Sequence, residues 1–334
     1  MKNRPSLYLA LLAVFAVSFA ASVARTQDVP VDQDWERYQH ILRASTLEWL
    51  FSEPFVLKVD YELYDLDGKL VEKGTAEESW TQEEVKTIRI QSPSLSEGSA
   101  PPSDEYKTHT RESYLVHQAL DDIARPFPSA IHDKDFAMEA FHEEVNGAQL
   151  SCFALAPGGN RTASTPTYCT DVDNRVIAMT GPQFVVERTD FRKSREHEVP
   201  MDVSVSYEGK KALIAHVTEL DALPFNPTAG SETKVHSDLA RIPGGVIAGR
   251  ILKKKNPDYP KQARKQHLGG TVILIAIITK QGTITALDVL ASPDPLFSKS
   301  AQDAVKTWTY QPYLLKGEPT EVDTTILVNY NLGR

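Results

Sequence analysis

The strongest fold signal in the chain lies in its C-terminal part and reads Gly269-Gly270-Thr271-Val272-Ile273-Leu274-Ile275-Ala276-Ile277-Ile278. The turn Gln281-Gly282 follows it, and then comes a second β-type run, Thr283–Leu290. Two such runs joined by a short turn with glycine predict an antiparallel hairpin.

Helical patterns flank this hairpin on both sides. Lys261–His267 follows Tyr259-Pro260, and Leu296–Thr307 follows Ser292-Pro293 with apolar residues at helical spacing. A last strand is predicted over Glu321–Asn329. The regular alternation of the two periods predicts a compact domain over residues 250–334, with helices on one side of an antiparallel sheet.

Several short motifs in this region occur in a fixed order. They are Tyr259-Pro260 before a helix with Ala263, a Gly-Thr-Val strand entry, the Gln-Gly hairpin, an Ala-Val-x-x-Trp helix end and a following Tyr-x-Pro. Together they closely resemble the TonB C-terminal domain over residues 250–334. The resemblance implies a binding module rather than an enzyme.

In that family the domain captures an extended peptide from an outer-membrane receptor, which pairs its backbone with an exposed sheet edge. Carried over to this chain, the resemblance implies these peptide-binding residues: Asn256, Pro257 and Tyr259 before the first helix, and Val322, Thr324, Thr325, Ile326, Leu327, Val328 and Asn329 in the last strand. The alternative for the last strand is that it is buried or paired in a dimer.

The beginning of the chain has the pattern of an export signal. Lys2 and Arg4 precede the apolar run Leu7–Ala21, and Ser22-Val23-Ala24 has small residues at the positions that signal peptidase reads. Residues 1–24 are therefore expected to be a signal peptide of a periplasmic protein. The alternative is an uncleaved inner-membrane anchor. No side chain from 7 to 24 titrates near neutral pH, which argues against coupling to a proton gradient.

Residues 32–225 are predicted to form a separate α+β domain. Asp34–Phe51 has amphipathic helical spacing, and a second helix is expected at Tyr114–Ile123. Phe55–Tyr64 and Lys69–Thr75 are alternating runs joined by Asp67-Gly68, a strong hairpin signal. Further strands with short turns and grouped helices predict a large antiparallel sheet.

The order of these pieces resembles the LolA-like lipoprotein carriers. The resemblance rests on the run Gly74–Trp80, a later short helix, the segment between the two cysteines, and Val199-Pro200 followed by a hairpin at Gly209. It implies a curved antiparallel half-barrel whose concave face holds acyl chains in a cleft lined by residues such as Val56, Val59 and Leu63. The alternative is that these residues fill a closed core.

Cys152 and Cys169 are the two cysteines of the chain. An even number in an exported protein, with a turn-rich segment between them, predicts a disulfide; two buried free thiols are the alternative. Residues 226–249 contain prolines and glycines without periodicity and are predicted to be a flexible linker.

The charge and the missing motifs exclude several function classes. The net charge of −9 argues against nucleic acid as a partner. The chain has no nucleophile elbow, zinc-binding helix, dinucleotide loop or phosphate loop, so no catalysis, cofactor or metal is expected. The sequence thus predicts an exported envelope protein that binds outer-membrane receptors in transmembrane transport. The alternative is a periplasmic carrier of lipid or lipoprotein.

Overall fold

The computed structural model describes residues 31–47, 54–80, 86–93, 96–97, 110–127, 136–145, 148–157, 165–181, 183–222, 239–241, 251–315 and 317–332. The predicted signal segment 1–24 lies outside these residues. Among the described residues, no helix is long and apolar enough to cross a membrane.

The helices are α1 (Val31–Ser45), α2 (Arg111–Ala124), α4 (Lys261–Lys265) and α5 (Pro295–Val305). The strands before residue 223 are β1 (Phe55–Tyr64), β2 (Leu70–Trp80), β3 (Lys86–Gln91), β4 (Ser96–Glu97), β5 (Phe136–Val145), β6 (Ala148–Pro157), β7 (Thr167–Thr170), β8 (Val176–Thr180), β9 (Phe184–Ser194), β10 (His197–Tyr207) and β11 (Lys210–Ala222). The later strands are β12 (Leu239–Arg241), β13 (Ile251–Lys253), β14 (Gly270–Ile278), β15 (Ile284–Ala291), β16 (Thr309–Tyr310), β17 (Tyr313–Leu315) and β18 (Glu318–Tyr330).

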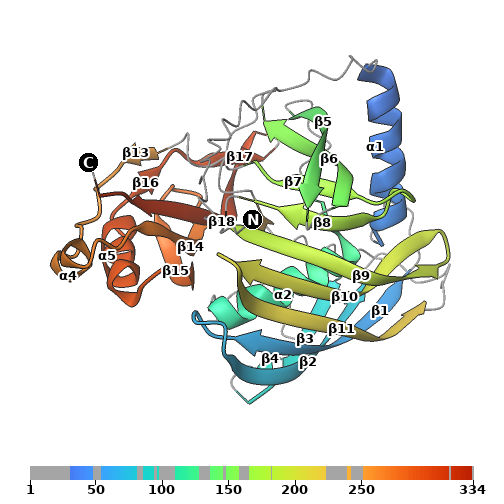
Figure 1. Cartoon of the computed structure of the whole chain (residues 1–334), viewed down its shortest axis with the longest axis horizontal. Coiled ribbons are helices and arrows are strands. Elements are labelled where there is room, and N and C mark those ends of the chain that lie inside the picture. Colours follow the sequence, from blue (N-terminus) through green and yellow to red (C-terminus); the bar gives the residue numbers. More distant parts are fainter. Residues whose placement is uncertain are drawn as a thin grey trace, which may run out of the picture.

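The first part of the chain forms one curved antiparallel sheet, which confirms the predicted α+β class (Figure 1). Its 11 strands lie in the order β4-β3-β2-β1-β11-β10-β9-β8-β7-β6-β5. The predicted hairpin at Asp67-Gly68 joins β1 and β2. Gly68 has a φ of 78°, and the carboxylate of Asp65 accepts hydrogen bonds from the backbone N–H of Asp67 (3.0 Å) and Lys69 (2.9 Å). This turn chemistry therefore sets the register of the first hairpin.

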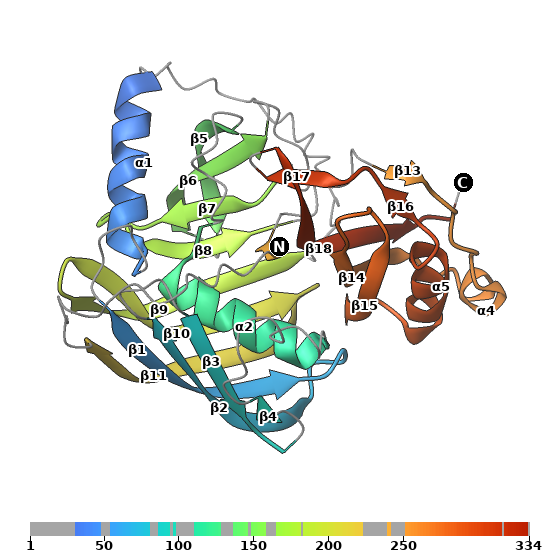
Figure 2. The ribbon, with the colours of Figure 1, turned by 180° about the vertical axis from the view of Figure 1, so that it is seen from behind.

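Helix α2 lies across the face of this sheet, over β1, β10 and β11 (Figure 2). It begins where Thr110 caps it, because the Thr110 hydroxyl accepts a hydrogen bond from the Ser113 N–H at 3.2 Å. Its inner residues are at most 1% exposed: Leu115, Val116, Ala119, Leu120, Ile123 and Ala124. The helix thus fills the face that it covers.

Two buried ion pairs fix the orientation of α2. Arg188 on β9 contacts the Asp122 carboxylate at 2.7 Å, with the two side chains 1% and 6% exposed. Arg125 contacts Glu78 on β2 at 2.5 Å, and the Glu78 side chain is fully buried. Removing one partner of such a pair would leave an uncompensated buried charge, so the pairs specify where the helix lies.

The second part forms a smaller sheet in the order β12-β18-β14-β15, with β17 paired to β18. Helix α5 starts at an Asp294 cap, whose carboxylate accepts the Leu296 N–H at 2.8 Å. Side chains of β14 alternate between two cores. Val272, Leu274, Ala276 and Ile278 contact the side of α4 and α5. Ile273 and Ile275 belong instead to the core of the large sheet.

The two parts therefore share a continuous core, which explains why β14 is apolar on both faces. Arg111, at the start of α2, links them. It is 7% exposed, and its guanidinium donates to the carbonyl oxygens of Leu290 (2.9 Å) and Tyr64 (2.7 Å). Its backbone N–H donates to the Asp288 carboxylate at 2.8 Å. Burial lowers the pKa of Arg111 from its usual value, and Glu112, Tyr207 and Asp288 oppose that effect.

Candidate functional site

The strand predicted to receive a peptide, Val322–Asn329, is the central portion of β18. On one side it pairs antiparallel with β14, with Gly270 opposite Tyr330 and Ile278 opposite Val322. On the other side, β12 pairs in parallel with Glu321–Asp323. From Thr325 to Tyr330, no strand that the structure describes pairs with β18 on the side opposite β14. The last strand is thus partly covered by β12, a short strand from the region predicted to be a linker.

The predicted binding residues on β18 differ in exposure. Val322, Ile326 and Val328 contact the core beneath the helices, and Thr324 is 3% exposed. Thr325 and Leu327 are half-buried, and Asn329 is exposed. The Asn329 side chain accepts a hydrogen bond from the Thr271 hydroxyl at 2.5 Å. The even-numbered side chains of β18 from Val322 onward therefore pack into the core. An extended segment could contact the strand through its backbone.

The segment 254–260 lies beside the end of β18. The Tyr259 ring packs edge-on against Phe297 (5.6 Å between ring centroids) and Tyr330 (5.8 Å). Its hydroxyl donates to the carbonyl of Leu268. Tyr259 is therefore a packing residue that ties the segment to β18, whereas Asn256 is exposed and Pro257 half-buried. Of these three predicted residues, the structure places Tyr259 against Tyr330, next to the Asn329 end of the strand.

A groove of about 280 Å³ lies between this segment and α5. Its lining residues are Lys255, Asn256, Asp258, Pro260, Leu296, Lys299, Ser300, Asp303 and Ala304. The Ser300 hydroxyl donates to the Asp258 carbonyl and joins the two walls. Cationic and anionic side chains border the groove beside the apolar side chains of Pro260, Leu296 and Ala304, so its wall offers both polar and apolar contacts.

The residues expected to line a lipid cleft do not share one face. Val59 and Leu63 are 1% and 0% exposed within the core that α2 completes. Val56 is half-buried on the opposite face, because burial alternates along β1. The expectation that Val56 lines the same face as Val59 and Leu63 is therefore wrong. Successive side chains of a strand point to opposite faces, and Val56 is an odd number of residues away from both. Among the described residues, Val59 and Leu63 fill a closed core beneath α2, which agrees with the closed-core alternative rather than with a lipid cleft.

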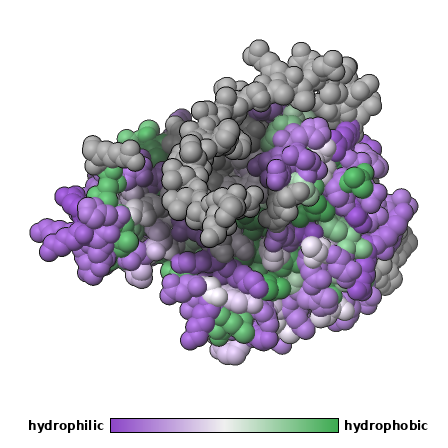
Figure 3. Space-filling view, in the orientation of Figure 1, coloured by the Kyte–Doolittle hydropathy of each residue, from purple (hydrophilic) through white to green (hydrophobic). Residues whose placement is uncertain are grey.

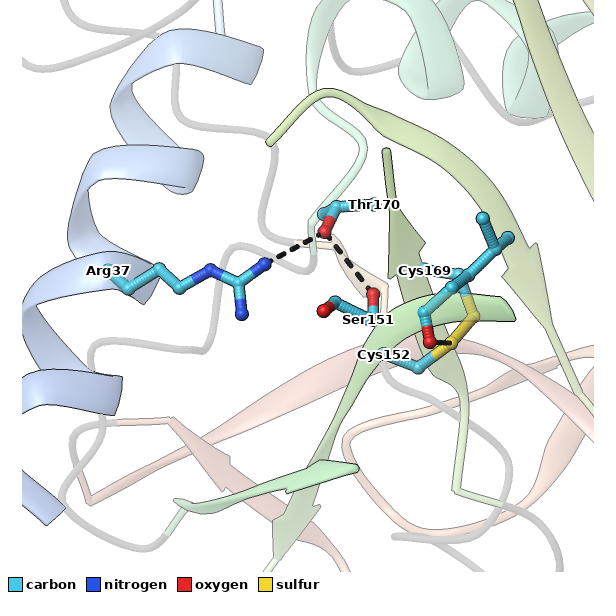
Figure 4. The surroundings of a disulfide bond; sticks show 6 residues. Arg37, Ser151, Cys152, Cys169 and Thr170 are labelled. Atoms are coloured by element: carbon cyan, nitrogen blue, oxygen red, sulfur yellow. Dashed lines mark hydrogen bonds between the residues drawn. A yellow bond between two sulfur atoms is a disulfide. The ribbon is translucent and has the colours of Figure 1, made fainter. Parts of the chain in front are cut away.

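The predicted disulfide between Cys152 and Cys169 is present, across directly paired positions of β6 and β7. Both cysteines are buried, at 3% and 0% exposure. Close by, Arg37 on α1 donates to the Thr170 hydroxyl (3.2 Å), which in turn donates to the Ser151 carbonyl (3.2 Å; Figure 4). The bridge and this hydrogen-bonded chain hold α1 and the β6–β7 pair together.

Two features of the structure, one at the site and one at the junction of the two sheets, were not predicted from the sequence. Strand β12 has three residues in a region without periodicity, so no local signal marks it. Arg111 opens a helix, a position where a charged side chain is usually solvated. Neither could be found without knowing which distant backbone groups they meet.

Comparisons with known proteins bear on the two parts separately. Residues 255–332 match the family described as Gram-negative bacterial TonB protein C-terminal. Protein TonB of Vibrio cholerae serotype O1 is 26% identical over 110 residues, which are 33% of this chain and 43% of that protein. This chain thus spans less than half the length of that relative.

Two solved structures match different parts of the chain. The solution structure of the Pseudomonas aeruginosa TonB C-terminal domain shares 24% identity, covering 25% of this chain and 87% of that domain with a TM-score of 0.23. A LolA superfamily protein from Nitrosomonas europaea shares 10% identity, covering 56% of this chain and 94% of that protein with a TM-score of 0.34. The family comparison confirms the resemblance drawn from the C-terminal motifs: residues 255–332 are similar to the C-terminal region of TonB proteins.

Proposed function

We propose that this chain is an exported envelope protein that captures an extended peptide of an outer-membrane transport receptor along β18, without catalysis. The observation that carries the proposal is the stretch Thr325–Tyr330, where β18 has a described partner strand on the β14 side only. The match of residues 255–332 to the TonB C-terminal family supports it. An added strand would gain affinity from main-chain hydrogen bonds and selectivity from alternate side chains.

The length of this stretch limits the peptide. Six residues in extended conformation span about 20 Å. A peptide that paired beyond Thr325 toward the start of β18 would have to displace β12, which occupies Glu321–Asp323. At its other end the peptide would reach Asn256 and the groove beside α5. The proposed site is therefore the backbone of Thr325–Tyr330 together with this groove.

Backbone-modified peptides test the proposal without altering the protein. Receptor-derived extended peptides would be titrated into the full chain by calorimetry, each with an N-methyl group at one of two successive positions. Because successive N–H groups of a strand point in opposite directions, only one phase can donate to β18. Loss of one net hydrogen bond, about 0.5–1.5 kcal/mol, would weaken binding about two- to tenfold in that phase alone.

Proline substitutions provide the matching test on the protein. Thr325→Pro and Leu327→Pro remove N–H groups of one phase, and Ile326→Pro removes one of the opposite phase. Proline substitution in one phase should lower the affinity for the peptide while the circular dichroism spectrum stays native. Proline substitution in the opposite phase should weaken the pairing of β18 with β14. Absence of binding by every unmodified peptide would refute the proposal, as would equal effects of N-methylation in both phases.

A further inference from the structure

The end of the molecule opposite the large sheet, where β13 and α4 lie (Figure 1), carries six exposed cations. We call it the basic end, and its residues are Lys253, Lys254, Lys255, Lys261, Arg264 and Lys265. All six side chains are exposed. Figure 3 shows hydrophilic residues over most of this protruding end. Within α4 only Ala263 is buried, so the helix directs its cations into solvent.

Within the part of the chain that the structure describes, the cations of the basic end have no ion-pair partner. Between residues 251 and 267 the only acidic residue is Asp258. None of the six cations forms an ion pair with another residue that the structure describes, and the nearby Asp303 is paired with Lys299 at 3.0 Å. Residues 243–334 hold 12 Lys+Arg and 7 Asp+Glu, whereas residues 1–242 hold 24 and 38. The basic end thus belongs to a part of the chain with net positive charge, whereas residues 1–242 have net negative charge.

Contacts with two aromatic residues hold the basic end in place. The Lys254 ammonium lies 5.0 Å from the centre of the Trp308 ring, and the Arg264 guanidinium lies 5.5 Å from that of Tyr259. The Trp308 ring N–H donates to the Lys255 carbonyl at 2.8 Å. The backbone that carries the lysine run is therefore fixed to α5 and its following strand, not a free tail.

The composition of the basic end favours a lipid surface over a protein partner. Five of its six cations are lysines, which act as hydrated point charges, whereas defined carboxylate recognition favours the planar fork of arginine. Leu252, beside Lys253, is 71% exposed. Exposed apolar side chains flanked by cations are typical of surfaces that contact the headgroup region of an anionic bilayer.

We propose that the basic end docks on the surface of a bilayer that contains anionic phospholipid. The acidic remainder of the chain would be repelled from the same surface, so docking also orients the molecule. This proposal rests on the charge and exposure of the basic end and is independent of peptide capture by β18.

Vesicle binding of the full chain tests the proposal. Two vesicle types would be compared by co-sedimentation: phosphatidylcholine alone, and phosphatidylcholine mixed with phosphatidylglycerol. The difference between them isolates the charge effect from any apolar insertion of residues 1–24. Each cation near an anionic surface strengthens binding about fivefold. Lys261→Gln/Arg264→Gln/Lys265→Gln should therefore lower the affinity for the mixed vesicles by about a hundredfold, and added salt should weaken binding of the unmodified chain.

A charge-matched control uses exposed cations elsewhere: Lys69→Gln/Lys193→Gln/Lys211→Gln. It removes the same charge and should change the affinity by less than about twofold. Circular dichroism would confirm that both variants fold. Equal binding of the unmodified chain to both vesicle types would overturn the proposal, as would equal losses in the two triple variants. Binding to an acidic peptide without binding to the mixed vesicles would also count against it.

Discussion

Replacement of Arg111 by methionine should lower the free energy of unfolding by about 3 kcal/mol. The substitution removes two hydrogen bonds from a charged donor, to the carbonyls of Leu290 and Tyr64. Each such bond contributes about 1.5–3 kcal/mol net. We take the lower value for both, because burial of the cation, which lowers its pKa, offsets part of the gain. Methionine keeps an apolar stem of similar length, so packing changes little.

The measurement is urea unfolding of the full chain, followed by tryptophan fluorescence and circular dichroism. Trp80 reports on the large sheet and Trp308 on the small one. In the Arg111→Met variant, we expect the small sheet to unfold at a lower urea concentration than in the unmodified chain, because its contact with α2 is weakened. Hydrogen exchange at β14 should also become faster.

The control is Arg89→Met, which removes an exposed arginine from an ion pair with Glu77 at 3.4 Å. Exposed pairs of this kind contribute about 0–1 kcal/mol. If Arg111→Met destabilises the protein no more than this control does, Arg111 does not link the two sheets and the junction rests on apolar contacts alone.

Three further outcomes follow from particular contacts. Cys152→Ala/Cys169→Ala should lower the free energy of unfolding by about 3 kcal/mol, since the bridge closes a loop with a sequence separation of 17; a loss below about 1 kcal/mol in denaturant titration would contradict this. Ala240→Pro, in β12, should raise the affinity for receptor-derived peptides longer than six residues by freeing the start of β18; unchanged calorimetric affinity would show that β12 does not compete. Gly282→Ala should lower the melting temperature more than Gly209→Ala does. The φ angles of the two glycines are similar (81° and 75°), but a Cβ at 282 would lie 1.9 Å from a carbonyl oxygen and one at 209 would meet nothing within 4 Å. Equal shifts would show that the backbone at 282 can move aside.

Much of the C-terminal fold could be predicted because its signals are local. The run from Thr271 to Ile278, the glycine turn at Gly282 and the Asp294–Pro295 helix start each determine a structure within a few residues of themselves. The same holds for the hairpin at Gly68. Turns and periodicities depend on backbone sterics and on which side chains share a face, both of which are readable from neighbours in sequence.

The rest was decided by tertiary contacts between distant segments. The apolar run of β14 is continuous because two different cores cover its faces, and the sequence alone does not say which core covers which face. The position of β12 on β18 depends on backbone hydrogen bonds that carry no side-chain pattern. Burial of Arg111 depends on two carbonyls, 47 and 179 residues away in the chain. Local sequence signals thus account for the C-terminal elements and the disulfide. Which described strands pair with each part of β18 follows from the folded structure, because it depends on which distant backbone groups meet.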